Sequence, residues 1–283
     1  MELIQVSLPK GAHVADRWLR TATLRPLNGD DGAFLAVDGR TLTPFERTSR
    51  LLERCLVKSD DKAVGVVHLP SLTVGDREAM LLNLYRGSFG SGIPATLVCP
   101  GCNESLEFDV AAENLLLEPE AQPTAATERV VSSDGKRYRC TIRPPTGADV
   151  EAVLPLAAEG PDEAAAELFA RCVTVIDDES LQTVEAPDPS LIGLLDEAFD
   201  SLDPQAETRL ALRCAACGLD FDGCLDAGEI LTRTARRKSD ELFQEVHLLA
   251  LHYHWSESEL LAMSQARRRV YLDLIGDDEV GRA

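Results

Sequence analysis

Basic residues are scarce in this chain, and their scarcity restricts what it can bind. The 283 residues include 28 Lys and Arg against 48 Asp and Glu, a formal net charge of −20. A nucleic-acid surface needs clustered Lys and Arg, so we expect no nucleic-acid partner. The excess of acid is concentrated between Glu151 and Glu207, where fifteen acidic residues accompany the single base Arg171. This segment indicates either a solvated helical face or an acidic surface for a basic partner.

Long apolar runs are also lacking. No stretch approaches the ~18 consecutive apolar residues of a membrane-spanning helix, so we expect no membrane insertion. The first ten residues have neither the basic start nor the apolar run of a signal peptide, which favours a cytoplasmic protein. The length is sufficient for two cores, or for one core with insertions.

Sequence motifs of catalysis are missing as well. No Gly-rich phosphate loop follows a strand and opens a helix, and no Ser/His/Asp arrangement stands out. The acids of Asp177–Glu179 lack the alternating ligands and the glycine of a calcium loop. No pair of residues has a spacing that suggests general acid and base catalysis. We therefore expect a protein that is not an enzyme and has no small-molecule substrate.

What the sequence does contain is two Cys-x-x-Cys pairs in matching surroundings. In each, a short β-prone run precedes a knuckle, and a turn residue then leads into a second β-prone run with a Phe near its end. Zn²⁺ binds four thiolates in a tetrahedron, and two knuckles from two hairpins can supply them. The sequence thus predicts a split zinc ribbon whose ligands are Cys99, Cys102, Cys214 and Cys217.

Other interpretations of these cysteines are a redox pair and unligated thiols. A disulfide needs an oxidising compartment or a redox role, and neither pair lies at the strand-to-helix junction of a thioredoxin-like motif. A closed shell of four thiolates leaves no position for substrate, so the predicted metal is structural. The remaining thiols, Cys55, Cys140, Cys172 and Cys224, lie singly in apolar surroundings and are expected in the core. Cys224 is close enough to Cys217 in sequence to be a spare ligand, although we do not favour it.

The predicted fold class is α+β, a mostly helical protein with a split zinc-ribbon hairpin pair and a small inserted β-hairpin. Five segments are expected in chain order. Residues 1–94 form a strand-plus-helices region, and 95–110 form the first knuckle. Residues 111–206 are an insertion that contains a linker, a hairpin and acidic helices, 207–226 form the second knuckle, and 227–283 form a helical arm.

Turn and capping residues predict the limits of individual elements. In the first half, we expect a strand at 20–27, a turn at 28–32, a helix opened by Thr43 and Pro44, and a helix from 74 that stops before Gly90. In the insertion, we expect a hairpin with its turn at 132–135 and helices at 148–156, 161–175 and 190–202. The C-terminal arm should contain helices at 239–253, at 256–262 with a Ser256/Glu259 capping box, and from Ser264 to Ile275, with Gly276 as the stop.

The C-terminal run of residues 245–272 resembles the tail of baseplate proteins from contractile phages. It contains a Tyr-x-Trp-Ser-Glu turn at 253–257 and an Arg-Arg-x-x-Tyr-Leu helix at 267–272. Two further segments, 24–29 and 74 through the first knuckle, are similar to relatives in extracellular contractile injection systems. Pro144 to Asp149, before a helix, also fits the family.

This resemblance implies a part or an assembly factor of a phage-tail-like contractile particle. Such proteins build the baseplate and hub, the hexameric platform that joins spike, tube and sheath, and some relatives resemble assembly chaperones. Baseplate, hub, spike or tube subunits are then the expected partners, and the protein would be cytoplasmic or incorporated into the particle. Candidate partner-binding residues are Trp255, Arg267, Arg268 and Arg269. The alternative is a free-standing zinc-ribbon adaptor in an unrelated pathway.

Overall fold

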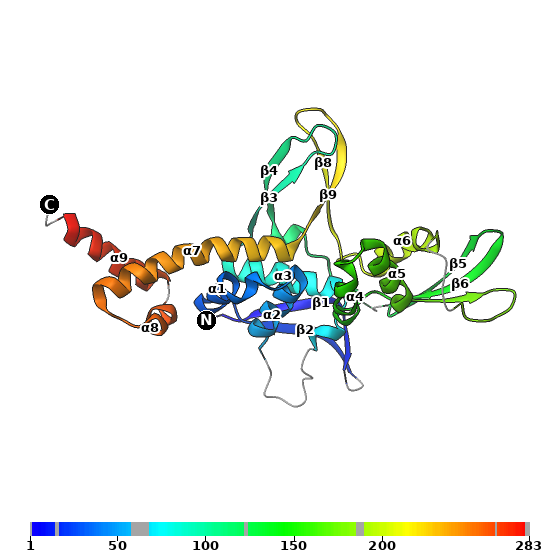
Figure 1. Cartoon of the computed structure of the whole chain (residues 1–283), viewed down its shortest axis with the longest axis horizontal. Coiled ribbons are helices and arrows are strands. Elements are labelled where there is room, and N and C mark those ends of the chain that lie inside the picture. The colour runs from blue at the N-terminus through cyan, green and yellow to red at the C-terminus, as the bar shows by residue number, and fades with distance from the viewer. Residues whose placement is uncertain are drawn as a thin grey trace. The chain divides into compact units, whose positions relative to one another are not determined.

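The computed structural model describes residues 2–14, 17–57, 68–121, 124–184, 190–263 and 265–280 (Figure 1). Small antiparallel sheets alternate with helices along the chain, which confirms the predicted α+β class. The chain divides into two compact units. The first comprises Met1–Pro26 and Cys55–Gly228, and the second comprises Leu27–Arg54 and Glu229–Ala283. Among the described residues, no helix is both long and apolar enough to cross a membrane.

The first unit begins with a hairpin of β1 (Ile4–Val14) and β2 (Arg17–Leu24). The sequence predicted only the second strand, because Pro9 and Gly11 break the alternation of the first. The register shifts between Ser7 and Ala12, and Gly11 has a φ of +74°. Asp76 Oδ1 accepts hydrogen bonds from the backbone N–H of Lys10 (2.9 Å) and Gly11 (3.2 Å). These bonds satisfy donors that the irregular strand leaves unpaired.

Helix α3 (Val74–Phe89) is the buried helix of this unit. Its residues are buried on nearly every side from Gly75 to Tyr85, as expected of a helix inside a core. Thr73 caps it by accepting from the Asp76 N–H (3.2 Å), and Gly90 ends it with a φ of +96°. This agrees with the predicted glycine stop. Strand β1 packs against α3, and Val6 and Leu8 of this strand are each 0% exposed.

Two separate hairpins follow the prediction for the ribbon. The first pairs β3 (Gly92–Val98) with β4 (Ser105–Ala111), and the second pairs β8 (Thr208–Arg213) with β9 (Asp220–Leu225). Figure 1 shows the two hairpins rising side by side.

Short 3-10 helices lie at Asp38–Arg40, Leu69–Ser71 and Ala112–Asn114.

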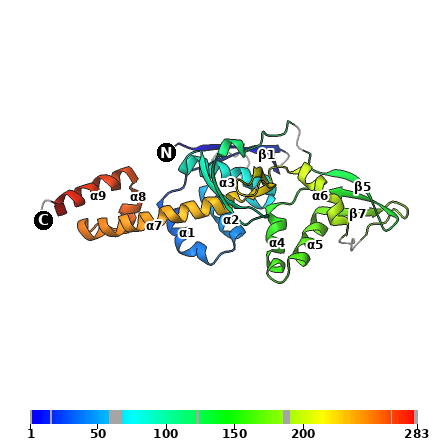
Figure 2. The ribbon, with the colours of Figure 1, turned by 90° about the horizontal axis from the view of Figure 1, so that it is seen from above.

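Between the hairpins lies an inserted subdomain with its own sheet and core. Strands β5 (Thr127–Ser133), β6 (Lys136–Ile142) and β7 (Val173–Asp177) form an antiparallel sheet in that order. Asp134 and Gly135, with φ of +51° and +77°, form the predicted turn. Helices α5 (Pro161–Cys172) and α6 (Ser190–Leu202) pack against these strands, and α4 (Gly147–Ala157) packs against α5 (Figure 2).

One prediction for this subdomain is wrong. The helix expected at 161–175 ends at Cys172, and the next residues form β7, which pairs with β6 from Val173 onward. Val173 and Val175 are β-branched, and both are buried in the subdomain core. As part of a strand, both side chains point into the core. These tertiary contacts outweigh the helical spacing of apolar residues on which the prediction rested.

The turn into α4 is fixed by a buried carboxylate. Asp149 binds Arg143 through both oxygens (2.6 and 2.9 Å) and accepts from Thr146. Arg171 on α5 adds a contact at 3.3 Å. Burial opposes ionisation of Asp149, but the hydrogen bonds from Arg143 and Thr146 outweigh it and hold its pKa below the usual value. One side chain thus links the end of β6 to both helices.

The second unit is helical. It contains α1 (Gly29–Ala36), α2 (Pro44–Cys55), most of α7 (Ala227–Tyr253), α8 (Glu257–Ala262) and α9 (Gln265–Val280). Its C-terminal helices share a core of Leu242, Val246, Leu249, Leu260 and Ile275. The opening of α2 by Thr43 and Pro44 and the Ser256/Glu259 capping box are confirmed.

Two predictions for this unit are wrong. Residues 28–32 form no turn but the start of α1, because Asn28 and Asp31 make a reciprocal capping box and Arg54 binds the buried Asp31 (2.9 Å). Gly276 does not end α9, which continues to Val280. A glycine costs about 1 kcal/mol inside a helix and is not sufficient to stop it. Ser264, the predicted cap, lies outside the described residues.

Candidate metal centre

Each knuckle is shaped by the same pair of backbone hydrogen bonds. The Cys99 N–H donates to the Glu104 carbonyl, and the Asn103 N–H donates back to the Cys99 carbonyl, both at 2.9 Å. The second knuckle repeats both bonds at 2.9 Å with Leu219 and Gly218 in the corresponding places. Asn103 and Gly218 have φ of +58° and +76°, a conformation open to Gly and Asn. The turn residue after each pair is therefore part of the knuckle, as its position in the sequence predicted.

The two knuckles bring the four predicted ligands together. All four sulfurs lie within 4.8 Å of one another, with Cys99 to Cys217 and Cys102 to Cys214 each at 3.6 Å. A disulfide needs about 2.05 Å. A tetrahedron with Zn–S distances of about 2.3 Å has sulfur-to-sulfur edges of about 3.8 Å. The spacing therefore fits a shared metal ion, and each short edge joins one hairpin to the other.

The two cysteines of each knuckle differ in burial, and Gly101 lies close to two of the sulfurs. The first cysteine of each knuckle is buried, Cys99 at 0% and Cys214 at 1% exposed, whereas the second is exposed. A Cβ atom on Gly101 would lie 2.8 Å from Leu219 Cδ2 and 3.8 Å from the sulfurs of Cys99 and Cys217. The glycine thus lets the Leu219 side chain approach the first knuckle. The sequence motif alone gave no sign of this contact.

The thiols influence one another strongly. Backbone N–H donation from Cys217 lowers the pKa of Cys214 to about 7. The N–H of Glu104 lowers the pKa of Cys102, but the three neighbouring thiols and desolvation outweigh it and raise this pKa to about 12. Four thiolates cannot crowd together without a cation, because each repels the next. A divalent ion would remove this repulsion and keep all four deprotonated.

The other cysteines lie apart from this group. Cys55, Cys140 and Cys172 are buried, as expected for small core residues. Cys224 is exposed and pairs with Arg209 across the second hairpin. Cys224 does not belong to the four-thiol group, which agrees with our preference against Cys224 as a spare ligand. The expectation that Cys224 lies in the core is wrong, because the residue is exposed.

The residues predicted to bind partners have different environments in the second unit. Trp255 stacks on Tyr253 (4.7 Å between ring centroids) and meets Tyr271 edge-on (4.8 Å). Arg268 is 7% exposed and bonds to Glu245 (2.8 Å), while Arg267 and Arg269 are exposed. Trp255 and Arg268 therefore hold α7, α8 and α9 together. A role of these residues in partner binding stays a prediction.

The four thiols of the two hairpins form a group that could hold a metal ion, with four ligand atoms from the chain itself. The sequence profile of a family described as T4 bacteriophage base plate protein matches residues 29–222, more than half of the chain. The chain belongs to this family. No curated protein and no solved structure matches it. The matched range includes both knuckles and the whole inserted subdomain, whereas the similarity noted at 245–272 lies outside it.

Proposed function

We propose that this chain is a non-enzymatic component or assembly factor of the baseplate of a phage-tail-like contractile injection system, with a ribbon fixed by Zn²⁺. The observation that carries the proposal is the family match, which spans both Cys-x-x-Cys knuckles. The ribbon is therefore built from the part of the chain that the family shares. Hub, spike or tube subunits are the proposed partners, and the finished particle or its assembly intermediate is the proposed location.

The role of the zinc in this proposal is mechanical. The knuckle sequences are more than a hundred residues apart, so the metal closes a long loop. Metal binding contributes directly to folding, because the unfolded chain has no preformed site. With four protein ligands and no open position, the ion supplies no catalysis. It would set the direction in which the hairpins leave the core and thus the surface that a partner meets.

The test is deletion and complementation in the genome that encodes the protein. Wild-type protein should restore complete sheathed tails with baseplates under the electron microscope, whereas a Cys214→Ser/Cys217→Ser variant should not. Cys224→Ser is the matched control, because it removes an exposed thiol of the same hairpin outside the metal group. Normal tails without the gene would overturn the baseplate role.

Mass spectrometry of purified particles separates the two forms of the proposal. Stoichiometric recovery of the chain indicates a structural component. Its absence from finished tails, together with its presence on hub or spike intermediates, indicates an assembly chaperone. Metal analysis of the purified chain should give one zinc per molecule. A metal-free protein with an intact ribbon contradicts the zinc part of the proposal alone.

A further inference from the structure

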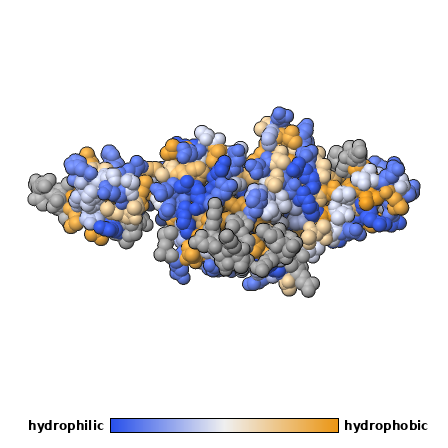
Figure 3. Space-filling model, turned by 90° about the horizontal axis from the view of Figure 1, so that it is seen from below, coloured by the Kyte–Doolittle hydropathy of each residue, from blue (hydrophilic) through white to orange (hydrophobic). Residues whose placement is uncertain are grey.

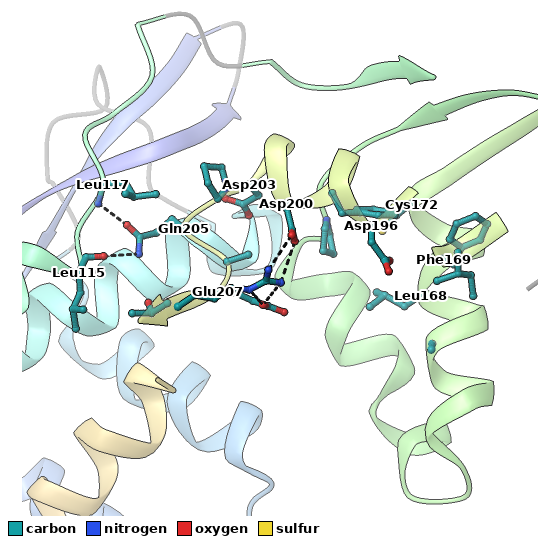
Figure 4. Close-up of a pocket in the computed structure, with 18 of the residues that line it drawn as sticks. Leu115, Leu117, Leu168, Phe169, Cys172, Asp196, Asp200, Asp203, Gln205 and Glu207 are labelled. Carbon is teal, nitrogen blue, oxygen red and sulfur yellow. Dashed lines mark hydrogen bonds and ion pairs between the residues drawn. The ribbon is translucent and has the colours of Figure 1, made fainter. Parts of the chain in front are cut away.

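A cavity of about 820 Å³ opens in the first unit between α5, α6 and the segment that leads into β8 (Figure 4). Leu115 and Phe169 contribute buried side chains to its lining, while Leu168, Ile192 and Phe199 are half-buried. This volume is typical of sites that enclose a drug-sized ligand or a few large side chains. Because the half-buried residues expose apolar atoms inside the cavity, the site favours an apolar occupant.

The edge of the cavity is acidic. Asp196, Asp200 and Glu207 are exposed residues of the lining. Arg209, the one base in the lining, binds both Asp200 (3.2 Å) and Glu207 (2.6 Å). Two of these three carboxylates thus pair with the one guanidinium of the lining, and the net negative potential favours a cationic group at the edge. The acidic stretch from Glu151 to Glu207, which the metal site leaves unexplained, supplies this edge.

Two buried polar residues of the lining bear on what the cavity can bind: one fixes its wall and the other offers a hydroxyl group. Gln205 is 1% exposed and its amide holds the opposite segment, donating to the Leu115 carbonyl (3.1 Å) and accepting from the Leu117 N–H (2.8 Å), as Figure 4 shows. Thr208 is 7% exposed and lines the cavity, yet its hydroxyl has no hydrogen-bond partner among the described residues. A buried hydroxyl of this kind is costly unless a ligand satisfies it.

We propose that this cavity binds an amphipathic, basic segment of another baseplate protein. One or two bulky apolar side chains of the segment fill the cavity, and a Lys or Arg beside them pairs with Asp196 and its neighbours. A polar group of the segment satisfies Thr208. The inference rests on the proposed function for the origin of the segment. Its chemistry, apolar with positive charge, follows from the lining alone.

On the face shown in Figure 3, hydrophilic and hydrophobic residues alternate in small groups. The lining of the cavity, by contrast, includes a leucine that is itself exposed to solvent, Leu117 at 47%. A neutral small molecule would leave the acidic edge unused, and an anionic one would be repelled by it. A peptide segment uses the apolar interior and the charged edge together, and it can continue along the acidic surface beyond the cavity.

The experiment measures binding of synthetic peptides to the full chain by fluorescence anisotropy. Overlapping peptides cover the other baseplate and tail proteins of the same genome. A reference set has three members: a 15-residue amphipathic peptide of Lys, Leu and Phe, its Lys→Glu version, and its Leu/Phe→Ser version. We expect saturable binding of basic amphipathic peptides and at least tenfold weaker binding of both altered versions.

Matched variants locate the binding. Leu117→Asp changes a lining residue, and Leu194→Asp changes a leucine of similar exposure (51%) outside the lining. Asp196→Lys and Glu197→Lys change net charge equally, but only Asp196 lines the cavity. Leu117→Asp should weaken binding about tenfold and Asp196→Lys about fivefold, with the two controls within twofold. Circular dichroism of each variant checks that it is folded.

Equal binding by the lining variants and their controls would overturn the proposed site. Equal binding of the Lys and Glu peptides would overturn the basic partner. Concentration-dependent self-association that Leu117→Asp abolishes would replace the partner by a second copy of this chain. If no peptide binds while the cysteine variants still fail to complement, this inference fails and the baseplate role stands. If basic peptides bind but deletion leaves tails normal, the site stands without that role.

Discussion

The ribbon hairpins and the inserted subdomain are both small antiparallel β structures, yet they are stabilised by different means. Near their ends the hairpins expose apolar residues, with Val98 at 58% and Leu219 at 41%, and the four thiols are their shared centre. The inserted sheet is covered by helices and encloses a core that includes Ile142, Leu191 and Leu195 at 0–1% exposure. A structure too thin to bury a core depends on metal, whereas three strands with helices do not.

Removing the metal should have the largest effect on stability, and it should destabilise the ribbon hairpins without destabilising the inserted subdomain. Structural zinc sites contribute on the order of 10 kcal/mol to the folding of small domains. Chelation, or Cys214→Ser with Cys217→Ser, should therefore abolish hydrogen-exchange protection in β3, β4, β8 and β9 near the knuckles. Protection in the β5–β6–β7 sheet should persist. Loss of protection in both regions together would show that they are one cooperative structure.

Truncating a core side chain of the inserted subdomain should destabilise the subdomain and leave the ribbon hairpins intact. Leu195→Ala removes a side chain that is 0% exposed and should destabilise the subdomain by about 2–5 kcal/mol. Limited proteolysis should then cut within 127–202 while the zinc content stays unchanged. Leu194→Ala on the same helix is the control, because that side chain is 51% exposed and its loss should cost less than about 0.5 kcal/mol. Zinc release by Leu195→Ala would contradict the independence of the two regions.

The Asp149 cluster should make the subdomain sensitive to acid. Asp149→Asn leaves Arg143 without its carboxylate and should cost about 2–3 kcal/mol at pH 7. Because the pKa of Asp149 is lowered in the folded state, the stability it adds is present above about pH 4, the unfolded value, and is lost as the pH falls further. The urea midpoints of wild type and variant should therefore approach each other as the pH is lowered below 4.

The control for this prediction is Asp178→Asn. Asp178 also pairs with arginines of the same sheet, but those arginines are exposed. An exposed pair contributes about 0–1 kcal/mol, so this variant should differ little from wild type at either pH. An Asp149→Asn variant as stable as Asp178→Asn at pH 7 would contradict the structural role of the cluster.

Glu78 on α3 should give the smallest effect, with the opposite sign. Burial, and then the Asp226 carboxylate, raise the pKa of Glu78 to about 7, and its Oε2 has no partner among the described residues. Stability from a group with a raised pKa is present below its unfolded value, about pH 4.3, and lost as the pH rises through 7.

Glu78→Gln should thus stabilise the chain by about 1–2 kcal/mol at pH 8 and have little effect at pH 4, where both forms are neutral. Melting temperatures at the two pH values measure this. Because Glu78 is neither a thiol of the metal group nor a partner of Asp149, zinc content and the Asp149 acid response should not change. A variant less stable at pH 8 would mean that the Glu78 carboxylate is favourable as a charge.

Several features were determined by the sequence alone, because they depend on residues a few positions apart. The two knuckles, the Thr43 and Ser256 caps and the Asp134–Gly135 turn follow from local hydrogen bonding and φ preference, and all are where the sequence placed them. The family resemblance has the same origin in short motifs. Local chemistry also misled at residues 28–32, where a cap resembled a turn, and at Gly276.

Tertiary structure alone decided the rest. Cys99 and Cys217 meet at 3.6 Å only because β3 and β8 leave the same core, and no spacing rule fixes that approach. Val173–Asp177 is a strand because β6 offers it hydrogen bonds and a core to cover, which outweighs helical spacing. The cavity beside α6 likewise combines residues from Asn114 to Leu210. Contacts between distant segments depend on how whole elements pack, and that packing is a property of the assembled core.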